Sequence, residues 1–294
     1  MSRHGHRDYF RKEKRMSTQI YYFSGTGNSF FIAKELIKLI PDAELTPIVK
    51  AIKEKEFITK AEAIGFLFPT HGLTLPIPVR IFLKNINVSS ANYLFAVATR
   101  GGTVFRGFPI INNAMARQGK KLNASFLIDM ALNDPKLSFY NDATKEELAL
   151  LQENALIKIR TIRKIVVHKE DHHDDAQSGE TFSRHPLLNY ILERFIPFMT
   201  HFISPKIKNY FYADSKCTGC EICEKVCLAQ KIKMHDKRPV WQKNITCYLC
   251  YTCLNYCPAK AIQIYSKVWM KSYTIERGRY LHPYATANDI AQQK

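Results

Sequence analysis

The 294-residue sequence predicts an α/β domain with a parallel sheet, followed by a small α+β domain built around cysteines. Strand-like and helix-like segments alternate from Thr18 to about His168, which is typical of parallel strands joined by crossover helices. All eight cysteines lie between Cys217 and Cys257, so we interpret them as metal ligands rather than as a disulfide framework. The length alone favours about two domains, and the 46% apolar and 23% charged residues are ordinary for a globular chain.

The elements of the first half follow from their apolar patterns. Expected strands are continuously apolar, as in a sheet that is covered on both faces; they are 20–23, 63–68, 93–98 and 125–130. A helix is predicted from Asn28 to Leu39, because its apolar residues share one face. A long helix is predicted from Thr144 to about His168, where Thr144 and Glu147 have the spacing of a capping box.

Composition divides the chain further. The expected segments are a basic, disordered N-terminal arm (1–16), the α/β domain (17–168), a linker with an amphipathic helix (169–210), the cysteine domain (211–266) and a C-terminal tail (267–294). The metal-capable side chains of 168–175 are interpreted as a solvated linker.

The amphipathic helix has a regular apolar stripe. Its members are spaced as on one helical face: Leu187, Leu188, Ile191, Leu192, Phe195 and Ile196. Pro197 is expected to kink or end the helix. We expect the stripe to dock on one or both domains. A dimer contact and an interfacial membrane helix are the alternatives.

The charge is unusual. Lys and Arg number 43 against 26 Asp and Glu, a net charge of +17 that indicates an acidic partner or surface. An acidic redox carrier such as a ferredoxin or flavodoxin is the expected partner, and peripheral contact with an anionic membrane is the other option. No nucleic-acid partner is expected, since no zinc-finger, RNP or helix-turn-helix pattern occurs. The apolar run from Phe195 to Pro205 is too short to span a bilayer and no secretory signal is readable, so a cytoplasmic location is expected.

The cysteines form two runs with the spacing C-x2-C-x2-C-x3-C, which bacterial ferredoxins use for [4Fe–4S] clusters. In two-cluster proteins the last cysteine of each run ligates the other cluster. One predicted cluster is therefore held by Cys217, Cys220, Cys223 and Cys257, and the other by Cys247, Cys250, Cys253 and Cys227. Structural zinc is the alternative, but zinc sites usually take two separated pairs of cysteines. Leu228 stands where such a run usually has a proline.

A turn of hydroxyls and glycines separates the first strand from the first helix: Ser24, Gly25, Thr26, Gly27, Asn28 and Ser29. A helix N-terminus after a strand is a common phosphate site. A P-loop is excluded because no lysine follows, and a dinucleotide fingerprint because Phe30 replaces its third glycine. The turn resembles the phosphate loop of flavodoxins, which holds the phosphate of FMN. That resemblance extends over about 150 residues and implies a five-stranded parallel sheet of order 2-1-3-4-5.

The flavodoxin resemblance also implies two loops beside the flavin ring. These follow the third and fourth strands and comprise Pro69, Thr70, His71 and Gly72, and Thr99, Arg100, Gly101 and Gly102. His71 and Arg100 replace the aromatic residues that many flavodoxins place there. An arginine beside the ring would stabilise a reduced, anionic flavin; the alternative is that Arg100 points to solvent and the loop is merely a turn. His71 is a candidate proton donor from position alone.

The whole chain resembles a family of fused flavodoxin and bacterial-type ferredoxin proteins, the iron–sulfur flavoproteins. Besides the cysteine runs, the resemblance includes 211–214 (FYAD), 239–241 (PVW) and 278–283 (GRYLHP). It implies FMN and two [4Fe–4S] clusters in one chain, and hence an electron-transfer protein that converts between one-electron and two-electron carriers. Two alternatives remain. One is a reductase of a quinone, nitro compound or free flavin, and the other is a redox sensor with an empty flavodoxin domain.

Overall fold

A computed structural model of the chain describes residues 17–134, 143–179, 185–203, 210–265, 274 and 278–294. The predicted disordered arm, 1–16, lies outside the described residues, as does most of the first part of the predicted tail. Among the described residues, no helix has the length and apolarity needed to cross a membrane.

The first half contains a six-stranded, wholly parallel sheet of order β2-β1-β3-β4-β5-β6. Its strands are β1 (Thr18–Tyr22), β2 (Ala43–Pro47), β3 (Ala63–Pro69), β4 (Tyr93–Arg100), β5 (Ala124–Asp129) and β6 (His172–His173). The first five have the predicted flavodoxin-like order. The sixth comes from a segment expected to be linker, where two histidines extend the edge beside β5.

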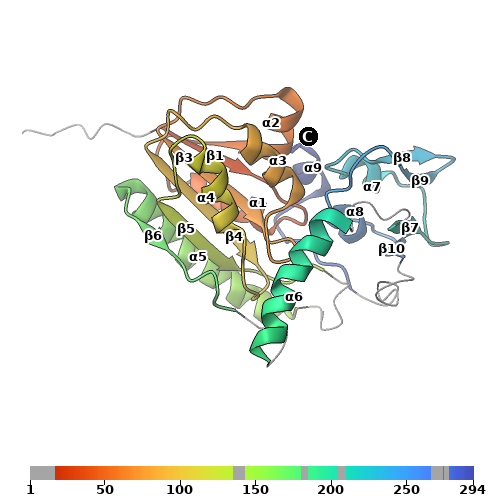
Figure 1. Cartoon of the computed structure of the whole chain (residues 1–294). Helices are drawn as coiled ribbons and strands as arrows, with labels where there is room; N and C mark the ends of the chain where they lie inside the picture. Colours follow the sequence, from red (N-terminus) through yellow and green to blue (C-terminus); the bar gives the residue numbers. More distant parts are fainter. Residues whose placement is uncertain (1–16, 135–142, 180–184, 204–209, 266–273, 275–277) are drawn as a thin grey trace, which may run out of the picture.

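Helices cover both faces of this sheet (Figure 1). They are α1 (Asn28–Ile37), α2 (Ile48–Glu54), α3 (Ile77–Asn85), α4 (Phe108–Ala116) and α5 (Lys145–His168). α1 and α5 pack on one face and α2, α3 and α4 on the other, which gives two apolar cores. α5 begins with the predicted capping box, in which Thr144 and Glu147 bond each other's backbone N–H.

The cysteine domain is small and consists of short elements. They are β7 (Phe211–Ala213), α7 (Ile222–Lys225), β8 (Ile232–His235), β9 (Arg238–Trp241), α8 (Thr252–Asn255) and β10 (Ile262–Ile264). β10 pairs with β7 and β8 with β9, both antiparallel. The chain then returns to the sheet domain and ends in α9 (Ala287–Ala291), close to α7 in Figure 1.

The two halves share one core. Val226, Leu228, Tyr256 and Ile290 belong to the same buried cluster as the α2, α3 and α4 face of the sheet. Leu228 is only 1% exposed there. Its apolar contact gives a physical reason for leucine at a position where ferredoxin-like runs usually carry proline.

The linker helix α6 (Pro186–Phe198) departs from prediction. Glu193 is its only buried residue, whereas four of the six stripe residues are exposed. The expectation that the stripe docks on the domains is therefore wrong for most of its length. The reason is a buried ion pair of Glu193 with Arg106, which turns the polar side inward. The α-helix ends one residue after Pro197, in line with the expected kink or end, and the chain continues as a π-helix, η1 (Met199–Ile203).

Candidate cofactor sites

The turn between β1 and α1 packs closely against the C-terminal segment. Gly27 has φ of 105°, in the left-handed region that favours glycine. A Cβ there would lie 2.4 Å from the Cβ of Ala285 and 2.8 Å from that of His282. Gly27 is thus required both by its backbone and by the C-terminal residues that pack against it.

The side chains of this predicted phosphate loop are buried and hydrogen-bonded within the protein. The Ser29 hydroxyl lies 2.8 Å from that of Thr99, a residue of the predicted ring-flanking loop. Asn133 Nδ2 donates to Thr26 Oγ1 at 2.5 Å. The Gly27 N–H donates to Ser24 Oγ at 3.2 Å. The loop is therefore a preorganised structure rather than an open turn.

The backbone donors at the start of α1 have no such partners. The N–H groups of Asn28, Ser29 and Phe30 have no acceptor among the described residues, and Gly27 supplies no side-chain cap. All three residues are buried, and buried unpaired N–H groups are costly. An anion at this helix N-terminus would satisfy them. The donor set fits the phosphate of FMN.

The predicted ring-flanking loops lie side by side. The Thr70 N–H donates to the Thr99 carbonyl at 2.7 Å. Thr70 Oγ1 is buried and has no hydrogen-bond partner among the described residues. The His71 ring meets Phe23 edge to face, with 5.9 Å between centroids. The orphaned Thr70 hydroxyl is a second polar group that a bound molecule would satisfy.

Glycines 72, 101 and 102 complete these loops. Gly72 has φ of 53°, and a Cβ there would meet the Thr200 side chain of η1. A Cβ on Gly101 would lie 2.9 Å from Leu132, while Gly102, with φ of 83°, faces open space. Pro69, the last residue of β3, pairs in register with Thr99.

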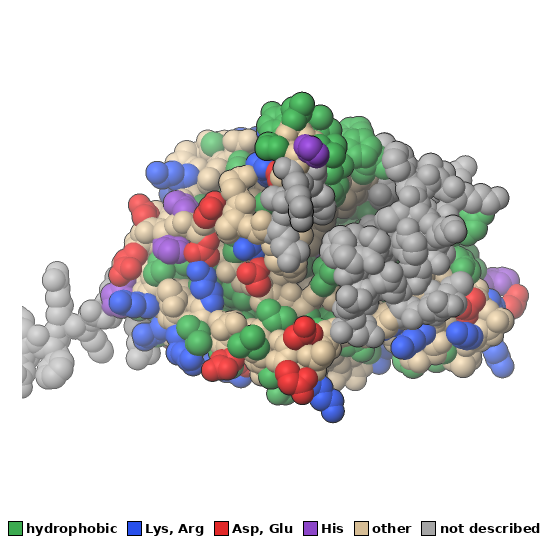
Figure 2. All heavy atoms as spheres, turned by 90° about the horizontal axis from the view of Figure 1, so that it is seen from below, with side chains coloured by type: hydrophobic (Ala, Val, Ile, Leu, Met, Phe, Trp, Pro, Cys, Tyr) green, Lys and Arg blue, Asp and Glu red, His purple; other side chains and the backbone are tan. Residues whose placement is uncertain are grey.

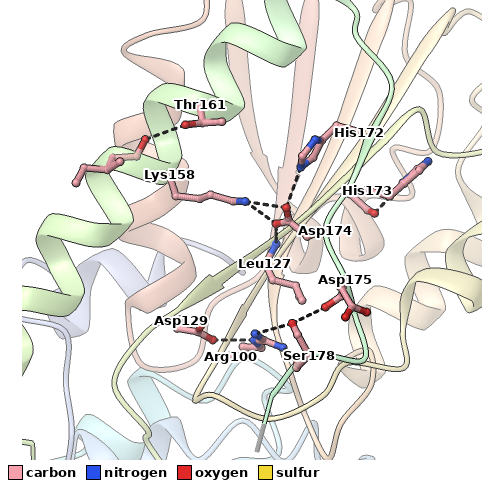
Figure 3. A network of polar contacts seen from close by, with 12 residues as sticks. Arg100, Leu127, Asp129, Lys158, Thr161, His172, His173, Asp174, Asp175 and Ser178 are labelled. Atoms are coloured by element: carbon pink, nitrogen blue, oxygen red, sulfur yellow. Dashed lines mark hydrogen bonds and ion pairs between the residues drawn. The ribbon is translucent and has the colours of Figure 1, made fainter.

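Arg100 points toward Asp129 of β5 and Ser178 of the linker (Figure 3). Its Nε donates to Asp129 at 2.7 Å, and Nη1 donates to the carbonyls of Thr103 and Ser178. Its side chain is only 8% exposed, so the alternative in which Arg100 points to solvent is wrong. Arg100 joins the ends of two strands to the linker.

The charged linker is also structural. Asp174 accepts from Lys158, from His172 and from the Leu127 N–H (Figure 3). Burial raises the pKa of Asp174, but these hydrogen bonds outweigh it and hold the pKa below its ordinary value. Within the described ranges, no three His, Cys, Asp or Glu side chains converge on a single ion. Most of 168–175 is exposed, as expected of a solvated linker, but His173 and Asp174 also bond this segment to the edge of the sheet.

One cysteine quartet surrounds a cavity. Cys227, Cys247, Cys250 and Cys253 line it together with aromatic residues of β7, β9 and the second run. A [4Fe–4S] cube needs four thiolates that each bind a separate iron, and the cysteines around this cavity supply four.

The other quartet is closer to solvent. Cys223 is buried and interacts electrostatically with Cys257, Cys220 and Cys217. Cys220 is exposed, whereas Cys217 and Cys257 are half-buried. The structure thus brings together both of the quartets that the spacing of the two cysteine runs predicts.

The buried thiols need metal to ionise. Burial, and then neighbouring thiols, raise the pKa of Cys247 to about 12, and burial raises that of Cys250 to about 11. Iron binding must therefore displace protons from these thiols. N–H groups already point at the sulfurs, with Lys231 N donating to Cys227 Sγ at 3.2 Å and Ala261 N to Cys257 Sγ at 3.2 Å.

The phosphate loop and the second cysteine run touch. A Cβ on Gly25 would lie 2.6 Å from the Cys250 carbonyl oxygen and 3.2 Å from the Cys250 Cβ. The Thr252 hydroxyl lies 3.0 Å from both the Gly25 carbonyl oxygen and Cys250 Sγ. Tyr248 meets the Phe23 ring edge to face. The two predicted cofactor sites are therefore adjacent.

The C-terminal segment, 278–294, supplies residues that our sequence reasoning missed. Tyr280 donates from its hydroxyl to Asn28 Oδ1 at 2.8 Å, and the His282 N–H donates to the Thr26 carbonyl at 2.9 Å. Gln293 pairs with the Ser24 backbone through two bonds of 2.9 Å. The 278–283 motif was a signal for the first two. Nothing in the sequence pointed to Gln293.

Comparisons with known proteins agree with part of this picture. A family model described as a 4Fe-4S dicluster domain matches residues 216–262. No curated protein matches the chain. Solved structures that are similar to part of the chain include rubredoxin oxygen:oxidoreductase from Desulfovibrio gigas, at 15% identity and a TM-score of 0.30. That match covers 51% of this chain and 37% of the other.

Two further structures are similar over about half of the chain. The two-electron reduced flavodoxin of Megasphaera elsdenii is 17% identical with a TM-score of 0.29, over 48% of this chain and 98% of that one. The Flv1 flavodiiron core from Synechocystis is 17% identical with a TM-score of 0.29, over 52% and 37%.

The strand order and the matched dicluster domain define the class: a flavodoxin-like α/β domain fused to an iron–sulfur domain. The chain thus combines a parallel α/β domain of the predicted strand order with a segment that matches a 4Fe-4S dicluster domain. Its iron–sulfur domain gives it a role in redox electron transfer.

Proposed function

We propose that the chain relays electrons between two [4Fe–4S] clusters and an FMN. Clusters carry one electron at a time, whereas a flavin exchanges one or two, so bound FMN would supply the conversion between the two regimes. Cys217, Cys220, Cys223 and Cys257 would hold one cluster, and Cys227, Cys247, Cys250 and Cys253 the other.

The observation that carries this proposal is the contact of Gly25 with Cys250. The loop that would hold the flavin phosphate and the loop that would ligate a cluster pack without a gap for another side chain. Thr252 ties them by hydrogen bonding at this point. An electron passing between the two sites would therefore cross a short, packed path rather than solvent.

The residues for FMN follow from the unsatisfied groups. The N–H groups of Asn28, Ser29 and Phe30 would bind the phosphate. The Thr26 and Ser29 hydroxyls would exchange their present partners for it, and Thr70 would donate from its loop. Arg100 is given no role at the ring, since it would have to leave Asp129.

The more exposed quartet would be the entry point. Cys220 is exposed at the surface of the cysteine domain. The net charge of +17 would draw an acidic carrier toward the chain and accelerate encounter at low salt. Electrons would then pass through the second quartet, beside Gly25.

Replacing Thr26 and Ser29 together by alanine tests the flavin site. We expect at least about a tenfold loss of bound flavin, because each hydroxyl lost to a phosphate costs about 1 kcal/mol or more. Iron should stay at about eight per chain. Chemical extraction of flavin and iron from anaerobically purified protein measures both.

The matched control is Thr161→Ala, an exposed hydroxyl on α5 remote from the loop. It should leave both contents unchanged. Full flavin retention in the double variant would show that the loop is misassigned. Near-zero iron with stoichiometric zinc would reverse the cluster assignment.

A further inference from the structure

The outward face of α6 and η1 is strongly apolar. Leu187 is 72% exposed, Tyr190 53%, Ile191 52%, Phe198 51% and Phe202 56%. Single exposed apolar residues are normal, but a row of large ones marks an interaction surface. Figure 2 shows hydrophobic side chains gathered at the upper edge of its view, where α6 lies. We call this row the α6 apolar face.

Buried polar contacts hold the helix in this orientation. Glu193 is 4% exposed, forms an ion pair with Arg106 and accepts from Asn189 Nδ2. Thr200 of η1 packs against Gly72, where no Cβ would fit. Rotating the helix to bury its apolar face would leave the Glu193 carboxylate and Arg106 unpaired, at a high cost. The outward apolar face is thus a determined feature of the fold.

A cation lies within that face. Arg194 is exposed, and its guanidinium lies 3.3 Å from the centre of the Tyr190 ring. In a symmetric dimer through this face, each Arg194 would be buried against an apolar surface or against its own copy. At a lipid interface the arginine would instead reach phosphate groups while its neighbours enter the acyl region.

The positive charge of the chain favours an anionic lipid surface over a second copy of the chain as the partner of this face. The chain carries a net charge of +17, and the exposed Arg194 lies on the face itself. Glu193 adds no exposed negative charge, because it is buried and paired. An apolar helix face that carries a cation, in a strongly basic chain, is the combination that binds anionic membranes.

We propose that the α6 apolar face is an interfacial membrane helix, which attaches the chain reversibly to anionic phospholipid surfaces. The helix lies in the plane of the interface and does not cross it. Attachment is independent of the cofactors, so it adds a location to the redox role and does not rest on the proposed relay.

Vesicle flotation of the full, cofactor-loaded chain tests this. Vesicles of phosphatidylcholine with about 30% phosphatidylglycerol should bind the chain, and pure phosphatidylcholine should bind it at least about tenfold more weakly. Raising the salt should release it, because surface charge is screened. Ile191→Glu with Phe198→Glu should lower binding at least about tenfold, and Arg194→Gln about fivefold, on the anionic vesicles only.

The control is Ile157→Glu on α5, an apolar residue of similar exposure at 49%. It should bind like the parent. Unchanged iron and flavin contents would show that the variants are folded. The proposal is overturned if no flotation occurs, or if the α6 and α5 variants bind alike. A concentration-dependent dimer that Phe198→Glu dissociates, without lipid binding, would make a second copy the occupant instead.

Discussion

The sheet domain and the cysteine domain bury different chemistry. The first fills two cores with side chains such as Phe66, Phe82, Phe95 and Phe126, all fully buried. The second has one small buried cluster of nine residues, and three of them are cysteines: Cys223, Cys227 and Cys253. Apolar burial thus accounts for the stability of the first domain, whereas the stability of the second depends on its cysteines being bonded to a metal cluster.

The two domains differ in whether the residues that stabilise the fold are also the residues that would bind a cofactor. In the sheet domain, the loops at the strand ends are free to bind because the cores carry the fold. In the cysteine domain, the ligands are themselves core residues, so losing the metal affects fold and chemistry together. The contacts of 24–29 with Cys250, Thr252 and the C-terminal segment connect the sheet domain to the cysteine domain.

Iron removal should have the largest effect, because we expect it to destabilise the cysteine domain and not the sheet domain. Anaerobic chelation is expected to remove the amide protection of 232–264, because protonated thiols replace bonded ligands in a core of nine residues. Protection of β3 and β4 should persist, since no cysteine is among the buried residues of their two cores. Hydrogen exchange read by mass spectrometry measures both. Equal protection of 232–264 before and after chelation would show that its apolar contacts suffice.

Gln293→Ala should loosen the contact between the halves. It removes two hydrogen bonds to Ser24 and leaves that backbone N–H buried, at a cost of about 2 kcal/mol. We expect faster hydrogen exchange in 24–29 and weaker retention of flavin. The neighbouring Gln292 is exposed, so Gln292→Ala is the matched control. Identical behaviour of the two variants would contradict a structural role for the C-terminal segment.

Lowering the pH should also weaken the packing of the C-terminal segment on the sheet domain, with a smaller loss of stability than Gln293→Ala. Burial lowers the pKa of His282 to about 4, from an ordinary value of about 6.5. Between these values the unfolded chain binds more protons, so this contribution is complete above pH 6.5 and is lost as the pH falls toward 4. At pH 5.5 the expected loss is about 1 kcal/mol.

Denaturant unfolding at pH 7.5 and 5.5, for the parent and for His282→Gln, measures this contribution. The variant should lose less stability than the parent on acidification. Equal losses would mean that His282 is not the titrating group. His282 stacks on Phe31 at 4.4 Å between centroids, so a neutral, planar replacement keeps the packing comparable.

Local patterns predicted the elements well. The α5 capping box, the buried strands β3 and β4, and the glycine turn before Asn28 depend on residues within a few positions of one another. The roles of Arg100 and α6 were harder. Asp129 and Ser178, which hold Arg100, are distant in sequence, and nothing local indicates that Glu193 would be buried rather than the stripe beside it.

The sequence by itself predicted a parallel sheet from the periodicity of its segments, and its strand order from the resemblance to flavodoxins. Cysteine spacing and the glycine-rich turn predicted the two quartets and the phosphate loop, because these are short-range patterns. Only the tertiary structure decided that Gly25 touches Cys250, that Gln293 caps Ser24 from 269 positions away, and that α6 turns its apolar side outward. Those contacts depend on how two cores pack and which buried charge finds its partner, and no short stretch of residues encodes either.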